Sequence, residues 1–104
     1  MFKIRGMKLT KEIILQKLRE IKPKLQQDYN LADLALFGSY ARDEQTLQSD
    51  IDLMIQMQTP SFRDYCRAAH TLEDLFPETK VQIVSRGAIR PQYFEYVKQD
   101  LLYA

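Results

Sequence analysis

The sequence is poor in several residue types that particular kinds of protein require. Its 104 residues include one cysteine, one histidine, three glycines and no tryptophan. A lone cysteine, Cys66, excludes a disulfide within the chain and a cysteine-based metal site, and it is typical of reducing compartments. No apolar run approaches the roughly 18 residues of a membrane span, and the N-terminal segment turns polar too early for a signal peptide. We therefore expect a cytoplasmic protein that does not insert into a membrane.

An excess of charge of one sign is also missing. The chain has 15 Lys and Arg against 14 Asp and Glu, which gives a formal net charge of +1. This balance provides no overall basic field, so direct binding of nucleic acid is not expected. The chain does have an apolar fraction of 45%, with six tyrosines and five phenylalanines. That composition is typical of a folded protein, and the length suits a single domain over residues 1–104.

Hydrophobic periodicity predicts alternating helices and strands. Ile14, Leu18, Ile21 and Leu25 have the spacing of one helix face, and Thr10 suits the N-cap position before them. The same reasoning along the chain predicts helices over 10–28, 61–76 and 92–103, and strands over 34–37, 51–57 and 80–84. This order predicts an α/β (α+β) fold in which a small mixed sheet of about three strands is flanked by helices.

The later helices carry residues whose burial the pattern also predicts. Phe62 and Leu72 are expected on one apolar side of the helix over 61–76. Cys66 is expected to be a small buried residue, because no histidine is placed to activate it. His70 is expected on the helix surface or in packing. The aromatic residues of 92–103 are expected to lie mostly in the core, with the remainder forming a partner surface.

Two acids interrupt the apolar stretch LFGSYARDEQTLQSDIDLMIQ, residues 36–56. Because side chains alternate along a strand, Asp50 and Asp52 share one face, roughly 7 Å apart, while Ile51 and Leu53 share the other. Unpaired like charges are costly to bury, so two alternatives remain. Either the strand end is exposed and the acids are ordinary solvated side chains, or a cation lies between them. Mg²⁺ fits the second alternative, since it binds through one or two carboxylates plus substrate phosphates.

A glycine-serine turn precedes the acids. Gly38 lets the backbone approach an anion closely, Ser39 adds a hydroxyl donor, and N–H groups at a helix start favour phosphate. The following segment, SYARDE, is expected to form a single helical turn. Arg42 either grips a phosphate through its planar guanidinium or braces the turn by pairing with an acid. A serine-capped turn without a ligand is a common alternative, but the turn and the acid pair together favour a nucleoside triphosphate with Mg²⁺. No Walker motif is present.

The motif GSYAR followed by SDIDL closely resembles the signature of minimal nucleotidyltransferases, which belong to the DNA polymerase beta-like superfamily. The resemblance covers most of residues 34–104, and its motif residues are Gly38, Ser39, Ala41, Arg42, Ser49, Asp50 and Asp52. It implies that Gly38 and Ser39 hold ATP by its phosphates and that Asp50 and Asp52 bind Mg²⁺. The metal would assist attack of a hydroxyl on the alpha phosphate. Small members of this kind resemble antitoxins paired with HEPN-type ribonuclease toxins, and the implied reaction transfers AMP to a toxin tyrosine.

One position departs from the family pattern. The family has a third acid in a segment of the form KVDLV, whereas this chain has KVQIV at residues 80–84, with Gln82 in place of the acid. Alternation predicts that Gln82 points toward Asp50 and Asp52 if the strands pair as expected. Glutamine cannot accept a proton as a base, and one general base contributes about 10²–10⁴-fold to a rate. The substitution is therefore expected to slow transfer.

Three explanations of Gln82 remain open. The protein is a slow transferase, or it is a nucleotide-binding relic that neutralises its partner by contact alone, or another acid replaces the missing one, with Glu73, Asp74 and Glu78 as candidates. We predict an antitoxin that adenylylates its partner and forms a homo- or hetero-oligomer. The alternative is a weak or inactive module that neutralises by binding alone. A metal-dependent nuclease would share the acids but would give no reason for the glycine-serine turn.

Overall fold

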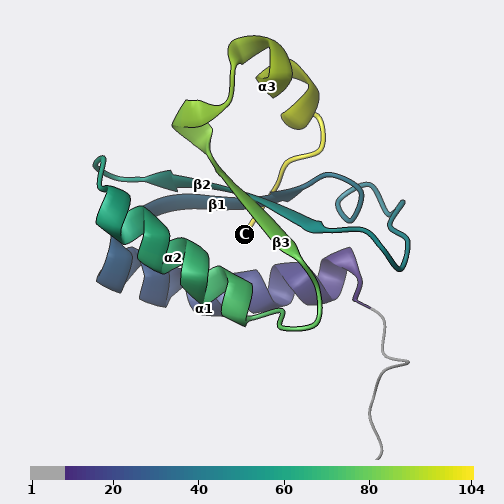
Figure 1. Cartoon of the computed structure of the whole chain (residues 1–104), viewed down its shortest axis with the longest axis horizontal. Helices are drawn as coiled ribbons and strands as arrows, with labels where there is room; N and C mark the ends of the chain where they lie inside the picture. Colours follow the sequence, from purple (N-terminus) through teal and green to yellow (C-terminus); the bar gives the residue numbers. More distant parts are fainter. Residues whose placement is uncertain (1–8) are drawn as a thin grey trace, which may run out of the picture.

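In a computed structural model that describes residues 9–104, a mixed four-stranded sheet separates two helices from a third (Figure 1). The elements in chain order are α1 (Lys11–Tyr29), β1 (Leu31–Phe37), β2 (Ile51–Met57), α2 (Phe62–Asp74), β3 (Val81–Ser85), the 3-10 turn η1 (Arg86–Ala88), α3 (Pro91–Val97) and β4 (Leu102–Tyr103). Helices α1 and α2 cover one face of the sheet, and α3 stands over the opposite face. The predicted α/β class is confirmed.

Helix α1 begins and ends where its local sequence directs. The Thr10 hydroxyl accepts a hydrogen bond from the Ile13 N–H at 3.2 Å, which satisfies one of the free donors of the first turn. Asn30 ends the helix in the left-handed conformation, with φ of 63°. The face predicted from periodicity is the one that is buried, since Ile14, Leu18 and Leu25 are fully enclosed. The core therefore starts on this helix.

The strands lie in the order β3-β2-β1-β4. β1 and β2 are antiparallel neighbours joined by the long segment 38–50, whereas β3 runs parallel to β2 after the crossover through α2. On the helix-covered face, Leu34, Leu36 and Leu53 pack with the apolar sides of α1 and α2. Strand alternation consequently sends Asp52 and Gln82 to the other face.

The C-terminal part of the chain differs from the prediction. The helix expected over 92–103 ends at Val97, and Leu102–Tyr103 forms a fourth strand. Leu102 lies opposite Leu36 in an antiparallel pair, and the Ala104 N–H donates to the Leu34 carbonyl at 2.9 Å. The open edge of β1 offers unpaired backbone groups, and pairing them outweighs the weak local preference for helix.

Three burial predictions for the later helices are wrong. Phe62 is 82% exposed and Cys66 is exposed, because α2 buries only the narrow stripe of Ala68 and Leu72. The aromatic residues of α3 are not core either: none of its side chains is buried, since the helix is short and stands away from the main core. His70 lies on the helix surface, which was one of the two positions predicted for it.

Within residues 9–104, no helix combines the length and hydropathy needed to cross a bilayer.

Candidate functional site

The two acids lie together at the start of β2. Asp52 is the second residue of β2, and Asp50 immediately precedes the first residue of this strand. Ile51 and Leu53, the intervening and following residues, are fully buried toward α1 and α2. The carboxylates are therefore on the uncovered face of the sheet, partly exposed, as the alternation of side chains predicts.

Gln82 meets the acids from the neighbouring strand. In the parallel register of β2 and β3, Gln82 lies beside Asp52. Its side-chain Nε2 donates a hydrogen bond to Oδ2 of Asp50 at 2.9 Å. The predicted orientation of Gln82 is thus confirmed, and the amide holds one of the two carboxylates in place.

The electrostatics of the pair favour a bound cation. Partial burial raises the pKa of the Asp52 carboxyl above its ordinary value, and the nearby charge of Asp50 raises it further, while Arg42 acts in the opposite direction. Both causes penalise the ionised form of Asp52. A cation between the carboxylates would offset the penalty, because it replaces lost hydration and screens the repulsion.

The donor set fits a hard oxygen-seeking cation. Asp50 and Asp52 provide carboxylate oxygens. Among the described residues, histidines, cysteines and acids form no metal-binding group of three or more, so the candidate site consists of this pair. Two carboxylates without nitrogen or sulfur ligands suit Mg²⁺, which completes its coordination with water and substrate phosphates. The two carboxylates therefore fit Mg²⁺.

Gly38 brings the turn after β1 into contact with Asp52. Its φ of +80° lies in the left-handed region, and a Cβ added there would overlap the Asp52 carboxylate. Beyond it, the Arg42 N–H donates to the Gly38 carbonyl at 3.1 Å and the Glu44 N–H to the Ser39 carbonyl at 2.9 Å. These bonds close a turn over residues 39–43 rather than a regular helix. None of the backbone bonds of this turn uses the N–H of Ser39.

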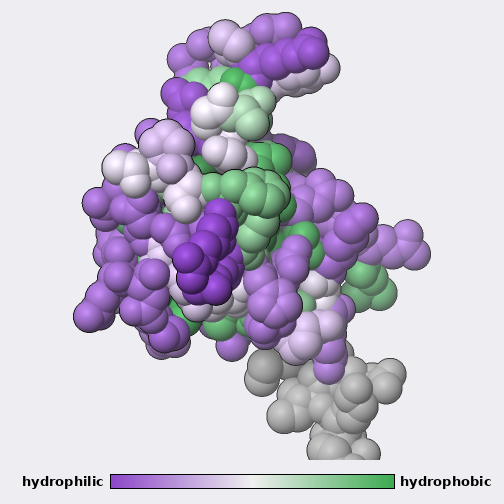
Figure 2. Space-filling model, turned by 60° about the vertical axis from the view of Figure 1, so that its left-hand side comes forward, coloured by the Kyte–Doolittle hydropathy of each residue, from purple (hydrophilic) through white to green (hydrophobic). Residues whose placement is uncertain are grey.

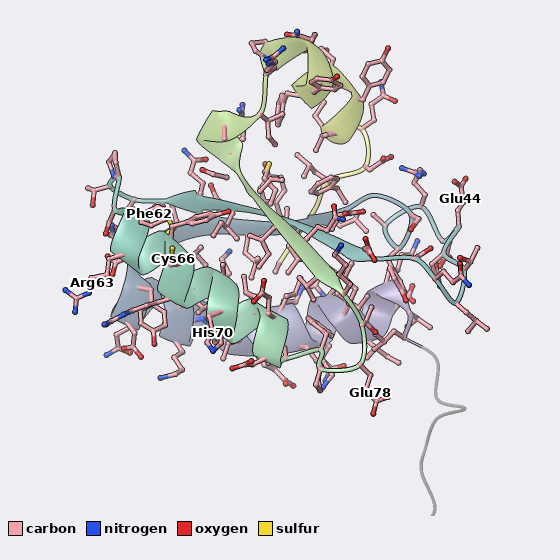
Figure 3. All side chains as sticks on the ribbon, viewed as in Figure 1. Glu44, Phe62, Arg63, Cys66, His70 and Glu78 are labelled. Carbon is pink, nitrogen blue, oxygen red and sulfur yellow. The ribbon has the colours of Figure 1, made fainter. Side chains whose placement is uncertain are left out.

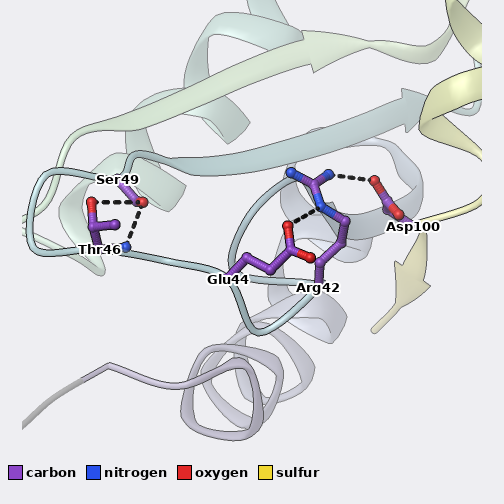
Figure 4. A network of polar contacts seen from close by, with 5 residues as sticks. All are labelled: Arg42, Glu44, Thr46, Ser49 and Asp100. Carbon is purple, nitrogen blue, oxygen red and sulfur yellow. Dashed lines mark hydrogen bonds and ion pairs between the residues drawn. The ribbon is translucent and has the colours of Figure 1, made fainter.

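Arg42 links the turn to the C-terminal part of the chain (Figure 4). Its Nη1 donates to Oδ2 of Asp100 at 2.7 Å, and its Nε donates to Oε1 of Glu44 at 3.1 Å. Of the two roles predicted for Arg42, the bracing contact is the one present in this structure. Asp100 was missed by the sequence reasoning, because nothing in the local pattern relates it to a residue 58 positions away.

A short hydrogen-bonded loop leads from the turn into the acids. The Ser49 hydroxyl accepts from the Thr46 N–H at 2.8 Å, as Figure 4 shows. This bond closes the segment immediately before Asp50. Ser49, a residue of the predicted motif, thus stabilises the backbone segment that precedes the acid pair.

The three acids considered as replacements for the missing one lie elsewhere. Glu73 and Asp74 are at the end of α2, which covers the opposite face of the sheet from Asp50. Asp74 lies near His70 instead, with an N–O distance of 3.5 Å. Figure 3 shows Glu78 extending away from the sheet in the loop before β3. In this structure Gln82 is therefore not backed by a neighbouring acid from these positions.

Comparison with models of known protein families assigns the chain to one family. The family described as "Polymerase beta, Nucleotidyltransferase" matches residues 19–101, which include the turn, both acids and Gln82. The chain belongs to the polymerase beta nucleotidyltransferase family. The matched range contains the sequence motif on which the resemblance was based.

Known relatives of this nucleotidyltransferase domain agree with the assignment. "Putative protein adenylyltransferase MJ0128" of Methanocaldococcus jannaschii is 39% identical over 88 residues, which cover 83% of this chain and 89% of the relative. A solved structure of a "putative minimal nucleotidyltransferase" superposes with a TM-score of 0.72 at 28% identity, over 93% of this chain and 98% of that chain.

A more distant structure shares the fold. It is a tri-AMPylated HEPN toxin of Shewanella oneidensis in complex with an MNT antitoxin, and the match has a TM-score of 0.58 at 20% identity. It covers 90% of this chain and 71% of that chain. With a TM-score of 0.58 at 20% identity, the match shows a common fold and nothing beyond the fold.

Proposed function

We propose that this nucleotidyltransferase domain binds ATP with Mg²⁺ and transfers AMP to a tyrosine hydroxyl of a HEPN-type toxin. The domain would act in the cytoplasm as the antitoxin of that toxin. The observation that carries the proposal is the contact between the Gly38 turn and the Asp52 carboxylate, with Asp50 beside it. In this proposal the backbone of the turn would bind the phosphates, and the adjacent carboxylates would bind the metal. A relative with adenylyltransferase in its name and a structural neighbour described as an MNT antitoxin on an AMPylated toxin support the partner and the reaction.

The residues divide the work by chemistry. The turn at Gly38 and Ser39 would hold the phosphates through backbone N–H groups and the serine hydroxyl, and Arg42 would brace this turn through Asp100. Asp50 and Asp52 would hold Mg²⁺, which when bound neutralises charge on the transferring phosphoryl group. In the reaction, the acceptor oxygen forms a bond to the alpha phosphorus, the bond to the beta phosphate breaks, and pyrophosphate leaves. The hydroxyl proton passes to water or to a group of the partner.

Gln82 favours a second candidate, a module that neutralises its partner by binding alone. Its amide cannot take a proton, and it donates to Asp50 at 2.9 Å, where an acid would provide a further metal ligand. A chain with this substitution still keeps the phosphate turn and both remaining acids. We therefore place slow transfer first and contact alone second.

Transfer of labelled AMP from ATP to the co-purified product of the neighbouring gene tests the proposal. The wild-type chain should label the partner, and Asp50→Asn with Asp52→Asn should abolish both labelling and neutralisation. If the double variant neutralises the partner as well as the wild type, the binding module is correct. Restoring the acid with Gln82→Asp should raise the transfer rate by tenfold or more, toward the range of about 10²–10⁴ for one general base.

A further inference from the structure

A large cleft opens beside the acid pair, on the face of the sheet that α1 and α2 leave uncovered. Its volume is about 1150 Å³, and Asp52 and Gln82 are among the residues that line it. The strands contribute Phe37 and Val84, the segment after β3 contributes Ile89, Tyr93 and Val97, and the start of α2 contributes Phe62 and Tyr65. In Figure 2, hydrophobic residues gather in the waist between the α3 segment at the top and the main body below.

The lining of the cleft suits a peptide better than a triphosphate. Asp52 and Arg90 are the charged residues among it, and most of the others are aliphatic or aromatic. Phosphates would lose hydration in such surroundings without gaining enough donors. Apolar side chains of an extended segment would gain from burial there, with a few polar groups fixing the orientation.

The order of the strands sets the direction from which an acceptor approaches. The Gly38 turn follows β1, Asp52 lies on β2, and Gln82 lies on β3, the outer neighbour of β2. The lining of the cleft includes residues of β3, of η1 and of the segment through α3, and none of the lining residues belongs to the turn over residues 39–43. In-line transfer places the attacking oxygen and the leaving pyrophosphate on opposite sides of the alpha phosphorus. With the outer phosphates on the turn, the acceptor hydroxyl enters from the cleft.

We propose that this cleft is the acceptor subsite, which takes an extended peptide segment whose apolar side chains flank the hydroxyl that receives AMP. The inference rests on the proposed function and adds the recognition element for its protein substrate. Tyr93 and Val84 both line the cleft, so these two residues would contact the side chains next to the acceptor hydroxyl. The nucleotide remains on the turn side of Asp52.

Two tyrosines of α3 provide a matched pair of variants for the test. Tyr93 lines the cleft and is 61% exposed, whereas Tyr96 is 74% exposed and lies outside the lining. Neither side chain is buried, so both Tyr93→Ser and Tyr96→Ser should fold, which thermal unfolding checks. Val84→Asn changes the lining of the cleft without adding charge near the acids.

The probes are short fluorescent peptides with a central tyrosine, flanked either by leucine and isoleucine or by glycine and serine. Their binding is measured by anisotropy with Mg²⁺ and a non-hydrolysable ATP analogue present, and the affinity for the analogue is measured separately by calorimetry. The apolar peptide should bind about tenfold more tightly than the polar one. Tyr93→Ser and Val84→Asn should remove most of this preference, Tyr96→Ser should preserve it, and the affinity for the analogue should stay unchanged in all three.

Three outcomes would overturn the assignment: equal binding of the two peptides, no binding of either, or a loss of nucleotide affinity in Tyr93→Ser, which would assign the cleft to the base. Failure of the proposed function has a different signature. It would show as wild-type chain that transfers no AMP, or as nucleotide binding that ignores the double substitution at Asp50 and Asp52. The peptide measurement needs no transfer, so the two failures are separable.

Discussion

The backbone of Gly38 adopts a φ of +80° at the point where the turn meets the Asp52 carboxylate. An L-residue with a Cβ is disfavoured there twice, by its own backbone conformation and by collision with the acid. The turn and the carboxylate can approach each other closely because this position has no side chain. The glycine therefore serves the geometry of the site rather than the flexibility of the loop.

Gly38→Ala is expected to lower the free energy of unfolding by about 1–3 kcal/mol, the cost of a non-glycine residue held in a disfavoured backbone region. It should also weaken ATP binding, because the methyl group displaces the Asp52 side chain. Thermal unfolding and calorimetry with ATP and Mg²⁺ measure the two effects. Gly87→Ala is the control, since a Cβ at Gly87 would meet no atom within 4 Å. Equal behaviour of the two variants would contradict the role of Gly38.

Asp52 is predicted to trade stability for function. Its folded-state pKa is raised, chiefly by burial and then by Asp50, so its ionised form is less favourable in the folded than in the unfolded chain. Stability contributed by the protonated group is fully present below the ordinary aspartate pKa of about 4 and is lost as the pH rises through the folded-state value. Asp52→Asn should consequently unfold at a higher temperature than the wild type at neutral pH in metal-free buffer.

The pH dependence checks the sign of this effect. The stability gain of Asp52→Asn should disappear in buffers below the ordinary aspartate pKa, where the wild-type carboxyl is protonated in both states. At neutral pH the same variant should lose magnesium-dependent nucleotide binding. A variant that is less stable than the wild type at neutral pH would contradict the electrostatic explanation.

At the scale of elements, the Arg42 contacts connect the turn over residues 39–43 to the segment that leads into β4. The Asp100 carboxylate is mostly covered, and its 2.7 Å contact with Arg42 ties residues 39–43 to the sheet edge opposite β3. Glu44, the second partner of Arg42, is more exposed, so the solvent screens its ion pair more strongly. The brace therefore depends chiefly on Asp100.

Asp100→Asn is expected to weaken ATP binding by about two- to fivefold, since a partly exposed ion pair contributes only modestly. Glu44→Gln should change the affinity less. Calorimetry with each variant measures the difference. Tighter binding in Asp100→Asn would mean that Arg42 leaves the brace and grips phosphate when the nucleotide binds.

Elements with a strong local pattern were predictable, and elements defined by distant partners were not. The faces of α1 and β2 followed from periodicity, because burial on one side imposes that spacing along the chain. β4 was missed because Leu102–Tyr103 is a strand only where the edge of β1 is available. The exposure of Phe62 and Cys66 was missed because it depends on how narrow the α1–α2 contact is. That width is a property of packing, which the sequence of α2 alone does not encode.

For the whole molecule, the same division separates the acid pair and the turn from the surroundings of the site. Gly38, Asp50 and Asp52 lie within one short stretch, so the sequence could predict that they lie close together, and the structure brings Gly38 against Asp52. The orientation of Gln82 followed from strand alternation once the two strands were assumed to pair, and the structure shows that they pair in parallel. Asp100 and the cleft under α3 required the fold, because their members come from β1, β2, α2, β3 and the C-terminal segment.

Magnesium-dependent binding of ATP is the proposed property on which the proposed activity and the proposed acceptor cleft both depend. Calorimetric titration of the wild-type chain with ATP should show saturable uptake in the presence of Mg²⁺ and little or none after chelation of the metal. Asp50→Asn with Asp52→Asn should abolish the uptake while the fold is retained. Absence of ATP uptake by the wild type with Mg²⁺, or uptake that is equal with and without the metal, would contradict the assignment of the acid pair and the turn to a metal–nucleotide site.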